Sequence, residues 1–371
     1  MWSVKRFEKD NFQIFEKKNG KHIDTIKAPI YIGDNRYEIK SILSASGGYG
    51  LIYNAEDKIL NNRKVLIKAR RYDKENGLFL IEHDMHRARR IKEIRENTKF
   101  EYDALVLFKK GRESRMPNVN DIVEGFCPSI YGPHITNEGK TFYCTDEELA
   151  FKEPYIVMQV IEGETLGEYV EKGIPHVMQK RGFKSIVQWE RCVLEIAKEL
   201  TSILQGFHHI NNVNGKKLYY IYQDLKPDNI MITSDKVITL LDFGGIKAVV
   251  EREDGTSNSN IKNGGPSALG TVGYSAPEIK SDPTSLDRRV DIYTLGATIY
   301  HLLTGEKLNE ILTEDKPDIP VENLEGKFTP ATCELVRKCV EVDKDKRYKD
   351  LEEVRTQILH HCFPNLKNVN N

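Results

Sequence analysis

The sequence predicts an α+β protein with two lobes, a mostly β lobe followed by a mostly α lobe. Its 371 residues, with a hydrophobic content of 39%, are sufficient to bury a sizeable core divided between two lobes or domains. Short strand-like runs fill residues 30–70, and helical periodicity dominates from about residue 164 onward. Size, strand pattern and helix pattern together predict the fold class.

The strand-like runs are rich in β-branched residues and are separated by Gly, Asn and Asp turns. They read APIYIG, YEIKSIL, LIYNA and KVLIKA, so we expect antiparallel sheet over residues 30–70. Before them, FQIFEKKNGKHIDTI has the pattern of a hairpin around an Asn-Gly turn. Residues 1–37 are therefore expected to be an N-terminal extension that could add a hairpin to the β lobe.

The middle of the chain changes character twice. Residues 78–110 contain no proline and have apolar residues at helical spacing, which predicts a largely helical segment. Residues 110–153 have little periodicity, and we expect loops around one or two short strands before YIVMQVIEG returns to a buried-strand pattern. The later helices are indicated by SIVQWERCVLEIAKELTSILQGFHH, VDIYTLGATIYHLLTG and ATCELVRKCVEV.

Charge and cysteine content exclude several classes of protein. Acidic and basic residues nearly balance, with a formal net charge of −1, so neither nucleic acid nor a membrane is expected as a partner. The six cysteines form no CxxC pair, and no long apolar segment occurs at the start or within the chain. These features predict a cytoplasmic protein with reduced thiols, in which Cys333 and Cys339 face a helical core.

The stretch YIYQDLKPDNIMI places three polar groups between apolar flanks. Asp224, held in a rigid loop by Pro227, could accept a hydroxyl proton, while the Lys226 ammonium could stabilise a transferring phosphoryl group. Downstream, MITSDKVITLLDFGG predicts two short strands around a turn, which would return Asp242 beside Asn229. Two such oxygen ligands favour Mg²⁺, whose other ligands come from phosphates and water.

From Asp224 onward, YQDLKPDN matches the catalytic loop of protein kinases, and further landmarks occur in that family's order. They are the Gly-rich loop in SASGGYGLIYNA, the lysine strand in KVLIKA, the hinge in YIVMQVIEGETL, and then LDFGG, GTVGYSAPEI, VDIYTLG and DKRY. The chain thus resembles the protein kinase family, and within it the serine/threonine branch, over roughly residues 38–360. The resemblance implies a bilobal kinase fold, with a β-rich lobe at 38–161, a helical lobe at 162–363 and a short tail at 364–371.

The resemblance also implies that the chain binds ATP and Mg²⁺. Lys68 would reach the α and β phosphates, Met158 would be the gatekeeper beside the adenine, and Met231 would form the pocket floor. Two residues depart from the family pattern, because Ala45 stands where the first loop glycine is usual and Leu66 where a small alanine is usual. The residues implied in nucleotide binding are Gly47, Gly48, Tyr49, Gly50, Ile52, Leu66, Lys68, Met158, Gln159, Ile161 and Met231.

Helix geometry selects the glutamate partner of Lys68. In the family, the residue four positions after this glutamate packs inward and should be apolar. Glu101 is followed at that offset by Leu105, whereas Glu82 is followed by a histidine. Glu101 is therefore favoured and Glu82 is the alternative, and residues 73–97 would then be an insertion before the family's usual helix.

Three features favour Ser or Thr side chains of proteins as the acceptor. Lys226 is typical of the serine/threonine branch, and Thr271 matches the threonine that bonds the catalytic Asp and Lys there. Glu278 and Arg347 match the ion pair that ties the family's substrate platform to the α lobe, a platform that small-molecule kinases of similar fold generally lack. The implied catalytic residues are Asp224, Lys226, Lys68, Glu101 and Thr271, and the implied metal ligands are Asn229 and Asp242.

Gln223 stands where many kinases have an arginine that binds the phosphate of the activation segment. A neutral amide cannot make that ion pair, so order in the segment should depend little on phosphorylation. The sequence therefore predicts a kinase of non-RD type, lacking the arginine before the catalytic aspartate, that is active without segment phosphorylation. The hydroxyl groups concerned are those of Thr256, Ser257, Ser259 and Ser267.

Two alternative functions belong to other classes. Ala45 and Leu66 give some support to a pseudokinase that binds nucleotide or a partner without catalysis. The complete set of residues for nucleotide and metal counts against it, namely Lys68, Asp224, Asn229 and Asp242. A small-molecule phosphotransferase is the second alternative, and the APE platform disfavours it.

Overall fold

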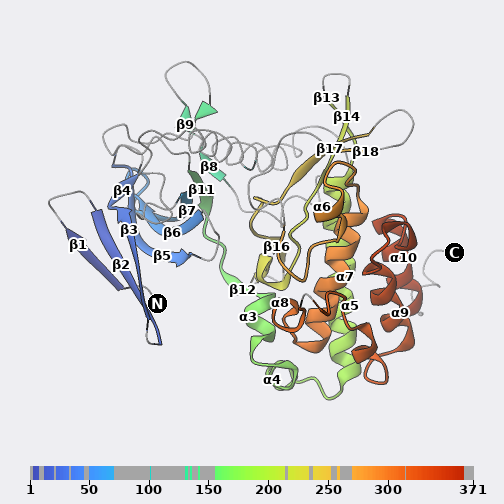
Figure 1. Cartoon of the computed structure of the whole chain (residues 1–371). Helices are drawn as coiled ribbons and strands as arrows, with labels where there is room; N and C mark the ends of the chain where they lie inside the picture. Colours follow the sequence, from blue (N-terminus) through green and yellow to red (C-terminus); the bar gives the residue numbers. More distant parts are fainter. Residues whose placement is uncertain are drawn as a thin grey trace. The chain divides into compact units, whose positions relative to one another are not determined.

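In the computed structural model, the described part of the chain divides into two compact units (Figure 1). The first unit takes the described residues up to Ile161, and the second takes those from Glu162 onward. The structure describes residues 3–7, 12–20, 22–32, 35–45, 50–70, 101, 130–132, 134–135, 141–142, 155–213, 216–233, 237–251, 257–259, 270–313 and 315–362.

The first unit is built from antiparallel strands. Its main sheet has the strand order β4-β5-β6-β7-β11-β8, beside a three-stranded sheet β1-β2-β3 and the pair β10-β9. The expected antiparallel sheet over residues 30–70 is therefore confirmed. The strands are β1 (Ser3–Phe7), β2 (Phe12–Asn19), β3 (His22–Pro29), β4 (Tyr31–Ile32), β5 (Tyr37–Ser44), β6 (Gly50–Asp57), β7 (Arg63–Arg70), β8 (Ile130–Gly132), β9 (His134–Ile135), β10 (Thr141–Phe142) and β11 (Ile156–Gln159).

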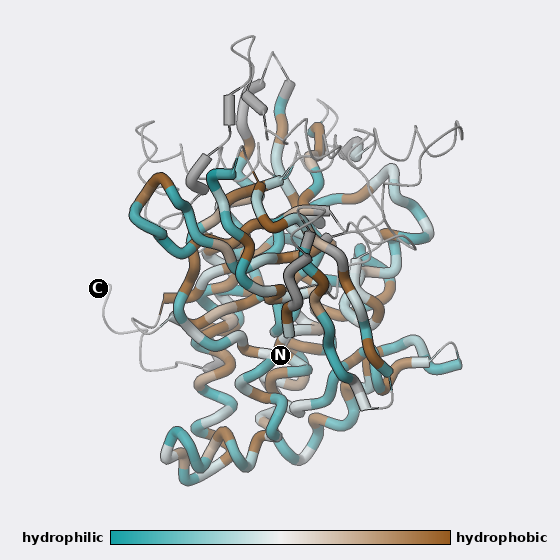
Figure 2. The backbone as a smooth tube through the Cα atoms, turned by 90° about the vertical axis from the view of Figure 1, so that its left-hand side faces the viewer, coloured by the Kyte–Doolittle hydropathy of each residue, from teal (hydrophilic) through white to brown (hydrophobic). Residues whose placement is uncertain are grey.

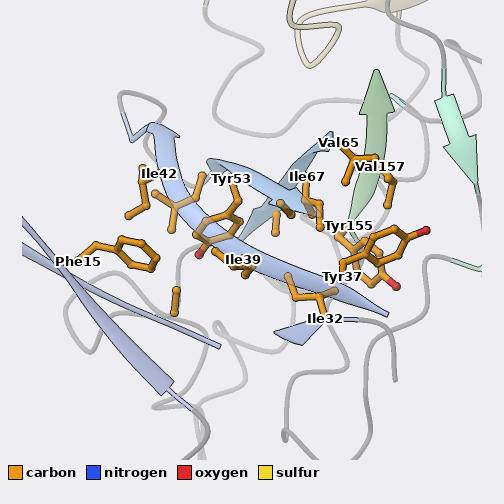
Figure 3. Close-up of a cluster of buried hydrophobic side chains, with 14 of the residues drawn as sticks. Phe15, Ile32, Tyr37, Ile39, Ile42, Tyr53, Val65, Ile67, Tyr155 and Val157 are labelled. Carbon is orange, nitrogen blue, oxygen red and sulfur yellow. The ribbon is translucent and has the colours of Figure 1, made fainter. Parts of the chain in front are cut away.

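The N-terminal strands share the hydrophobic core of this unit. Phe15 on β2 and Ile26 on β3 belong to the same buried cluster as Ile39 on β5, and Figure 3 shows Phe15 and Ile39 in this cluster. The buried Gln13 amide also donates a hydrogen bond to the Ile39 carbonyl at 3.0 Å. Gly20, with a φ of 60°, makes the turn between β2 and β3, where glycine adopts the left-handed region at little cost.

The second unit is mostly helical and is organised around α7, whose residues are buried on nearly every face. Helix α7 contacts α5 and α9, and α10 contacts the same two helices (Figure 1). The Trp189 indole on α5 donates to the Leu302 carbonyl on α7 at 3.0 Å. The helices are α3 (Leu166–Glu171), α4 (Ile174–Arg181), α5 (Ile186–His208), α6 (Glu278–Ser281), α7 (Arg289–Thr304), α8 (Leu308–Ile311), α9 (Pro330–Cys339) and α10 (Leu351–Cys362), with 3-10 turns η3 (Pro227–Asn229), η5 (Val321–Leu324) and η6 (Lys344–Lys346).

Two small sheets accompany these helices. The first has the order β12-β15-β16, and the second has the order β13-β14-β17-β18. The second sheet was not expected from the sequence, although the Asn-Gly pair at 214–215 between two polar-apolar runs is a hairpin pattern. The strands are β12 (Gly163–Thr165), β13 (Asn211–Val213), β14 (Lys216–Ile221), β15 (Ile230–Thr233), β16 (Ile238–Leu240), β17 (Lys247–Glu251) and β18 (Ser257–Asn258).

Apolar and polar stretches alternate along the backbone in Figure 2, as amphipathic elements require. Cys333 and Cys339 are buried on α9, which confirms them as core residues of a helix. None of the helices that the structure describes combines the length and the apolar character needed to cross a bilayer.

Candidate active site

A buried carboxylate fixes the backbone that leads into the candidate site. Asp291 on α7 is fully buried, and its Oδ1 accepts a hydrogen bond from the Gln223 amide at 2.8 Å. Its Oδ2 accepts another from the Tyr222 amide at 2.9 Å. Gln223 has a φ of 67°, which residues other than glycine rarely adopt. These bonds hold a strained turn immediately before Asp224.

Asp224 is the centre of a group of four polar side chains. Its Oδ1 accepts the Thr271 hydroxyl at 2.6 Å, and its Oδ2 accepts the Lys226 ammonium at 3.1 Å and the Asn229 amide at 2.9 Å. The Lys226 ammonium also donates to the Thr271 hydroxyl oxygen at 2.5 Å. The carboxylate is therefore oriented by a hydroxyl, an ammonium and an amide at once. The structure thus brings four of the predicted site residues together.

The position before Thr271 requires glycine. Gly270 has a φ of 64°, and a Cβ at this position would lie 2.1 Å from the Ser275 hydroxyl oxygen. That hydroxyl donates to the Thr271 carbonyl at 2.8 Å, so Ser275 cannot move away without losing the bond. Substitution of Gly270 would consequently displace the threonine that contacts Asp224.

Asn229 and Asp242 lie at neighbouring ends of the β15–β16 hairpin. Ile230 pairs with Leu240, and the Leu241 amide donates to the Asn229 carbonyl at 2.8 Å, so the hairpin expected from the sequence is confirmed. The Asn229 side-chain nitrogen donates to the Asp224 carboxylate, so the oxygen of the same side-chain amide points away from Asp224. Asp242 follows directly, is exposed and has a φ of 53°.

An amide oxygen and a carboxylate at adjacent strand ends fit Mg²⁺, which prefers oxygen ligands. Within the described ranges, no group of three or more His, Cys, Asp or Glu side chains could hold a metal ion. A magnesium ion held by Asn229 and Asp242 would therefore take its remaining ligands from phosphate and water.

In the first unit, one face of the main sheet carries the residues implied in nucleotide binding. Along β7, Val65, Ile67 and Ala69 are buried in the core, so Leu66 and Lys68 point to the opposite face.

Cross-strand pairing extends this face to two further strands. Ile52 on β6 pairs with Lys68, and Met158 on β11 pairs with Leu66. Directly paired residues lie on the same side of a sheet, so these four side chains share one face.

Lys68 forms an ion pair on this face. Its Nζ lies 2.6 Å from the Glu101 Oε1, and the Glu101 side chain is only 8% exposed. Burial of the carboxylate makes this charge-assisted bond strong, because little water competes for it. The structure therefore places Glu101 where the helix periodicity predicted the lysine partner. Glu82 lies outside the described residues.

Other residues implied in nucleotide binding are described only in part. Gly47, Gly48 and Tyr49 lie outside the described residues, and Gly50 begins β6. Ala45, the departure from the glycine pattern, packs against the core of the first unit. Gln159 ends β11 and Ile161 ends the first unit, while Met231 lies on β15 of the second unit.

A second buried pair anchors the segment that follows Thr271. The Arg347 guanidinium donates to both oxygens of the Glu278 carboxylate, at 2.6 and 2.8 Å, and both residues are buried. The ion pair expected from the sequence is thus confirmed. Nearby, the Tyr274 hydroxyl and the His301 Nδ1 lie 2.7 Å apart, and burial lowers the pKa of His301 to about 4.

The family model for the protein kinase domain matches residues 138–363, which contain the Asp224 group and the Glu278–Arg347 pair. The matched part exceeds half of the chain. The chain belongs to the protein kinase family. This membership supports ATP-dependent kinase activity.

The curated relatives are serine/threonine kinases. Serine/threonine-protein kinase Nek10 of Mus musculus is 26% identical over 359 residues, which are 92% of this chain and 26% of that protein. Serine/threonine-protein kinase PknB of Mycobacterium leprae is 27% identical over 242 residues, which are 62% of this chain and 33% of that protein. The chain therefore spans about a quarter to a third of the length of these relatives.

The fold is also found in a solved structure. The PpkA-294 apo form has a TM-score of 0.52 with this chain at 18% sequence identity. The match covers 87% of this chain and 96% of that chain.

Two residues of this kinase domain have roles that the sequence did not indicate. His208, at the end of α5, is buried, and its Nε2 lies 2.8 Å from the Asp291 Oδ2. The Tyr222 hydroxyl donates to the Leu241 carbonyl, which joins the catalytic loop to the strand end before Asp242. The sequence signal for these contacts is Asp291, an aspartate within the apolar helix α7. A carboxylate buried in such a helix needs hydrogen-bond donors from other elements.

Proposed function

We propose that this chain is a serine/threonine protein kinase that transfers the γ-phosphoryl group of MgATP to Ser or Thr hydroxyls of protein substrates. The observation that carries the proposal is the group formed by Asp224 with Lys226, Asn229 and Thr271. Family membership and the serine/threonine kinases among its relatives give independent support. The cytoplasm is the proposed location, in agreement with the cysteine pattern.

Each residue of this group has a chemical task. The oxygen of the substrate hydroxyl bonds to the γ-phosphorus, and the bond from that phosphorus to ADP breaks. The Asp224 carboxylate accepts the proton that the hydroxyl loses. The Lys226 ammonium, 3.1 Å from the same carboxylate, stabilises negative charge on the phosphoryl group. Thr271 holds the carboxylate and the ammonium in register through its hydroxyl.

The remaining site residues bind the nucleotide. Asn229 and Asp242 would hold Mg²⁺, which neutralises phosphate charge when bound. Lys68, oriented by Glu101, is assigned to the α and β phosphates. Side chains on the Leu66 and Met158 face are assigned to the adenine.

Independence from segment phosphorylation is part of the proposal. Gln223 replaces the arginine to which a phosphate on the activation segment would bind. The residue is buried, with a relative exposure of 3%. Of the four hydroxyl groups named from the sequence, that of Ser259 is buried and hydrogen-bonded, so only Thr256, Ser257 and Ser267 remain as phosphate acceptors. Alanine at these three positions should leave the initial rate within about twofold of wild type, since Gln223 offers no positive charge to a phosphate on this segment.

A transfer assay with radiolabelled ATP tests the proposed activity. Wild-type protein should label casein on Ser and Thr, and Asp224→Ala should reduce labelling by about a thousandfold or more, because proton acceptance and positioning are lost together. Asp318→Ala, which removes an exposed aspartate of the same unit, is the matched control and should retain the wild-type rate.

The same assay separates the two alternative functions. A pseudokinase would bind ATP in equilibrium measurements but give equal, background labelling for wild type and Asp224→Ala. A small-molecule phosphotransferase would label alcohols such as glycerol or choline and leave casein unlabelled. Either result would overturn the proposed function.

A further inference from the structure

Ser259 lies in the activation segment, the stretch between Asp242 and Glu278, and is buried. Its relative exposure is 1%. Its hydroxyl donates to the Pro283 carbonyl at 2.8 Å and accepts from the Leu286 amide at 3.2 Å. Its own amide donates to the Thr284 carbonyl at 3.1 Å. We call Ser259 with these three partners the Ser259 clasp.

The partners of Ser259 belong to a loop that is fixed at both ends. Before the loop, α6 begins at Glu278, whose carboxylate is held by Arg347. After it, α7 carries Asp291, whose carboxylate holds the backbone of the catalytic loop. The clasp therefore ties the activation segment to the same framework that positions Asp224.

Strand pairing connects Ser259 to the catalytic loop from the other direction. Ser259 follows β18, which pairs with β17, and β17 pairs with β14 through five residue pairs. Strand β14 ends at Ile221, three residues before Asp224. Backbone hydrogen bonds of this kind need no charged group.

Contacts of two basic side chains, Lys247 and Arg288, reinforce the same arrangement. The Lys247 ammonium on β17 donates to the Pro283 carbonyl at 3.0 Å, so this carbonyl accepts from both Lys247 and Ser259. Arg288 lies 3.6 Å from the Glu251 carboxylate and stacks over the Tyr219 ring at 4.0 Å.

Charge distinguishes this arrangement from one that depends on phosphate. Gln223, at the position of the phosphate-binding arginine, has a buried amide nitrogen without a hydrogen-bond partner in the described part of the chain. A neutral serine with two neutral backbone partners holds the segment instead.

We infer that Ser259 is a positioning residue that holds the activation segment in its active arrangement without phosphate. An anionic group at Ser259 therefore lowers activity. The inference rests on the proposed kinase function. An ionised carboxylate or a phosphate dianion has no proton to donate to the Pro283 carbonyl, and burying either charge without a partner is costly.

Two substitutions test the inference. Ser259→Ala removes both hydroxyl bonds with little change in volume and should lower kcat/KM for casein about tenfold, mainly through KM. Ser259→Asp should lower it by more than about thirtyfold, because it places a charge in a buried site. Ser281→Ala, which removes an exposed hydroxyl at the end of α6 and outside the clasp, should leave kcat/KM within about twofold of wild type.

Equilibrium ATP binding and hydrogen exchange complete the test. Both Ser259 variants should bind ATP with wild-type affinity, while the amides of residue 259 and Leu286 should exchange at least about tenfold faster.

A Ser259→Asp variant with raised activity, paired to Lys247, would overturn the inference. So would unchanged kcat/KM in both variants, or an equal loss of ATP affinity and casein phosphorylation. If wild type transfers no phosphate, the proposed function fails, and unchanged exchange in both variants would then overturn the clasp separately.

Discussion

Lys68 and Glu101 show how one short contact can be placed from sequence periodicity. The glutamate was selected because an apolar residue follows it at the fourth position, and the structure sets its carboxylate 2.6 Å from the lysine ammonium. Their assignment to phosphate binding is a prediction from the family resemblance.

Glu101→Gln tests that assignment. The substitution keeps the size of the side chain but removes its charge, so the lysine loses about 2 kcal/mol of orienting interaction and kcat/KM should fall about thirtyfold. Lys68→Met should be at least as severe, and the double variant should be no worse than Lys68→Met alone. Lys64→Met, an exposed lysine on the same strand, is the control. Additive losses would show that the two residues act independently.

His301 provides a pH-dependent test at the level of a single residue. Burial holds its folded-state pKa at about 4, while an unfolded chain protonates histidine near pH 6.5. Asp228 raises this pKa and Lys307 lowers it, but burial dominates. Below pH 6.5 the unfolded state binds the extra proton, so stability falls as the pH drops toward 4.

The expected loss is about 3 kcal/mol of unfolding free energy between pH 7 and pH 4, relative to a variant without the imidazole. His301→Gln retains an acceptor for the Tyr274 hydroxyl and is a suitable reference. Denaturant unfolding of both proteins at a series of pH values measures the difference. Parallel pH profiles would show that His301 does not titrate in this window.

At the scale of elements, the Glu278–Arg347 ion pair joins the start of α6 to the residue that follows the η6 turn. Besides the carboxylate, the guanidinium donates to the carbonyls of Glu341, Val342 and Arg289. Arg347→Met would leave a buried carboxylate without a partner, at an expected cost of about 3–5 kcal/mol.

Denaturant unfolding provides the measurement for this pair. Arg347→Met combined with Glu278→Gln should recover at least half of the lost stability, because the buried charge is then absent. Arg337→Met breaks an exposed pair with Glu325 and should cost less than about 1 kcal/mol. Equal costs for the two arginine substitutions would contradict the role assigned to burial.

Elements with strong local patterns could be predicted, and those that depend on distant contacts could not. The strands of residues 30–70, the long α5 and the β15–β16 hairpin follow from alternation, helical periodicity and turn residues. The β13-β14-β17-β18 sheet depends on pairing between segments that the sequence pattern does not connect. Strand β17 could not be predicted, because its five residues are too short a run to show a clear strand pattern.

The candidate site shows the same division. Asp224, Lys226 and Asn229 lie within six residues, so one motif contains most of the group, and Thr271 required the family resemblance. Ser259 and His208 could not be assigned from sequence, because their partners are 24 and 83 positions away. Burial of a polar side chain is visible only in the folded chain.

At the scale of the whole molecule, the two units contribute different groups to one proposed reaction. The proposed function assigns the nucleotide to the Lys68 face of the first unit, and it assigns proton transfer and the metal ion to residues of the second unit. Contacts that include no phosphate, among them the Ser259 hydrogen bonds and the pairing of β14 with β17, hold the described parts of the activation segment. The central claim is therefore catalysis by a kinase domain that carries no phosphate.

The most direct test is the initial rate of casein phosphorylation by protein whose intact mass shows that no phosphate is attached. We expect linear product formation without a lag from the first measured turnover, and no product for Asp224→Asn prepared in the same way. A rate at background, or a lag that ends only as the enzyme phosphorylates itself, would contradict it.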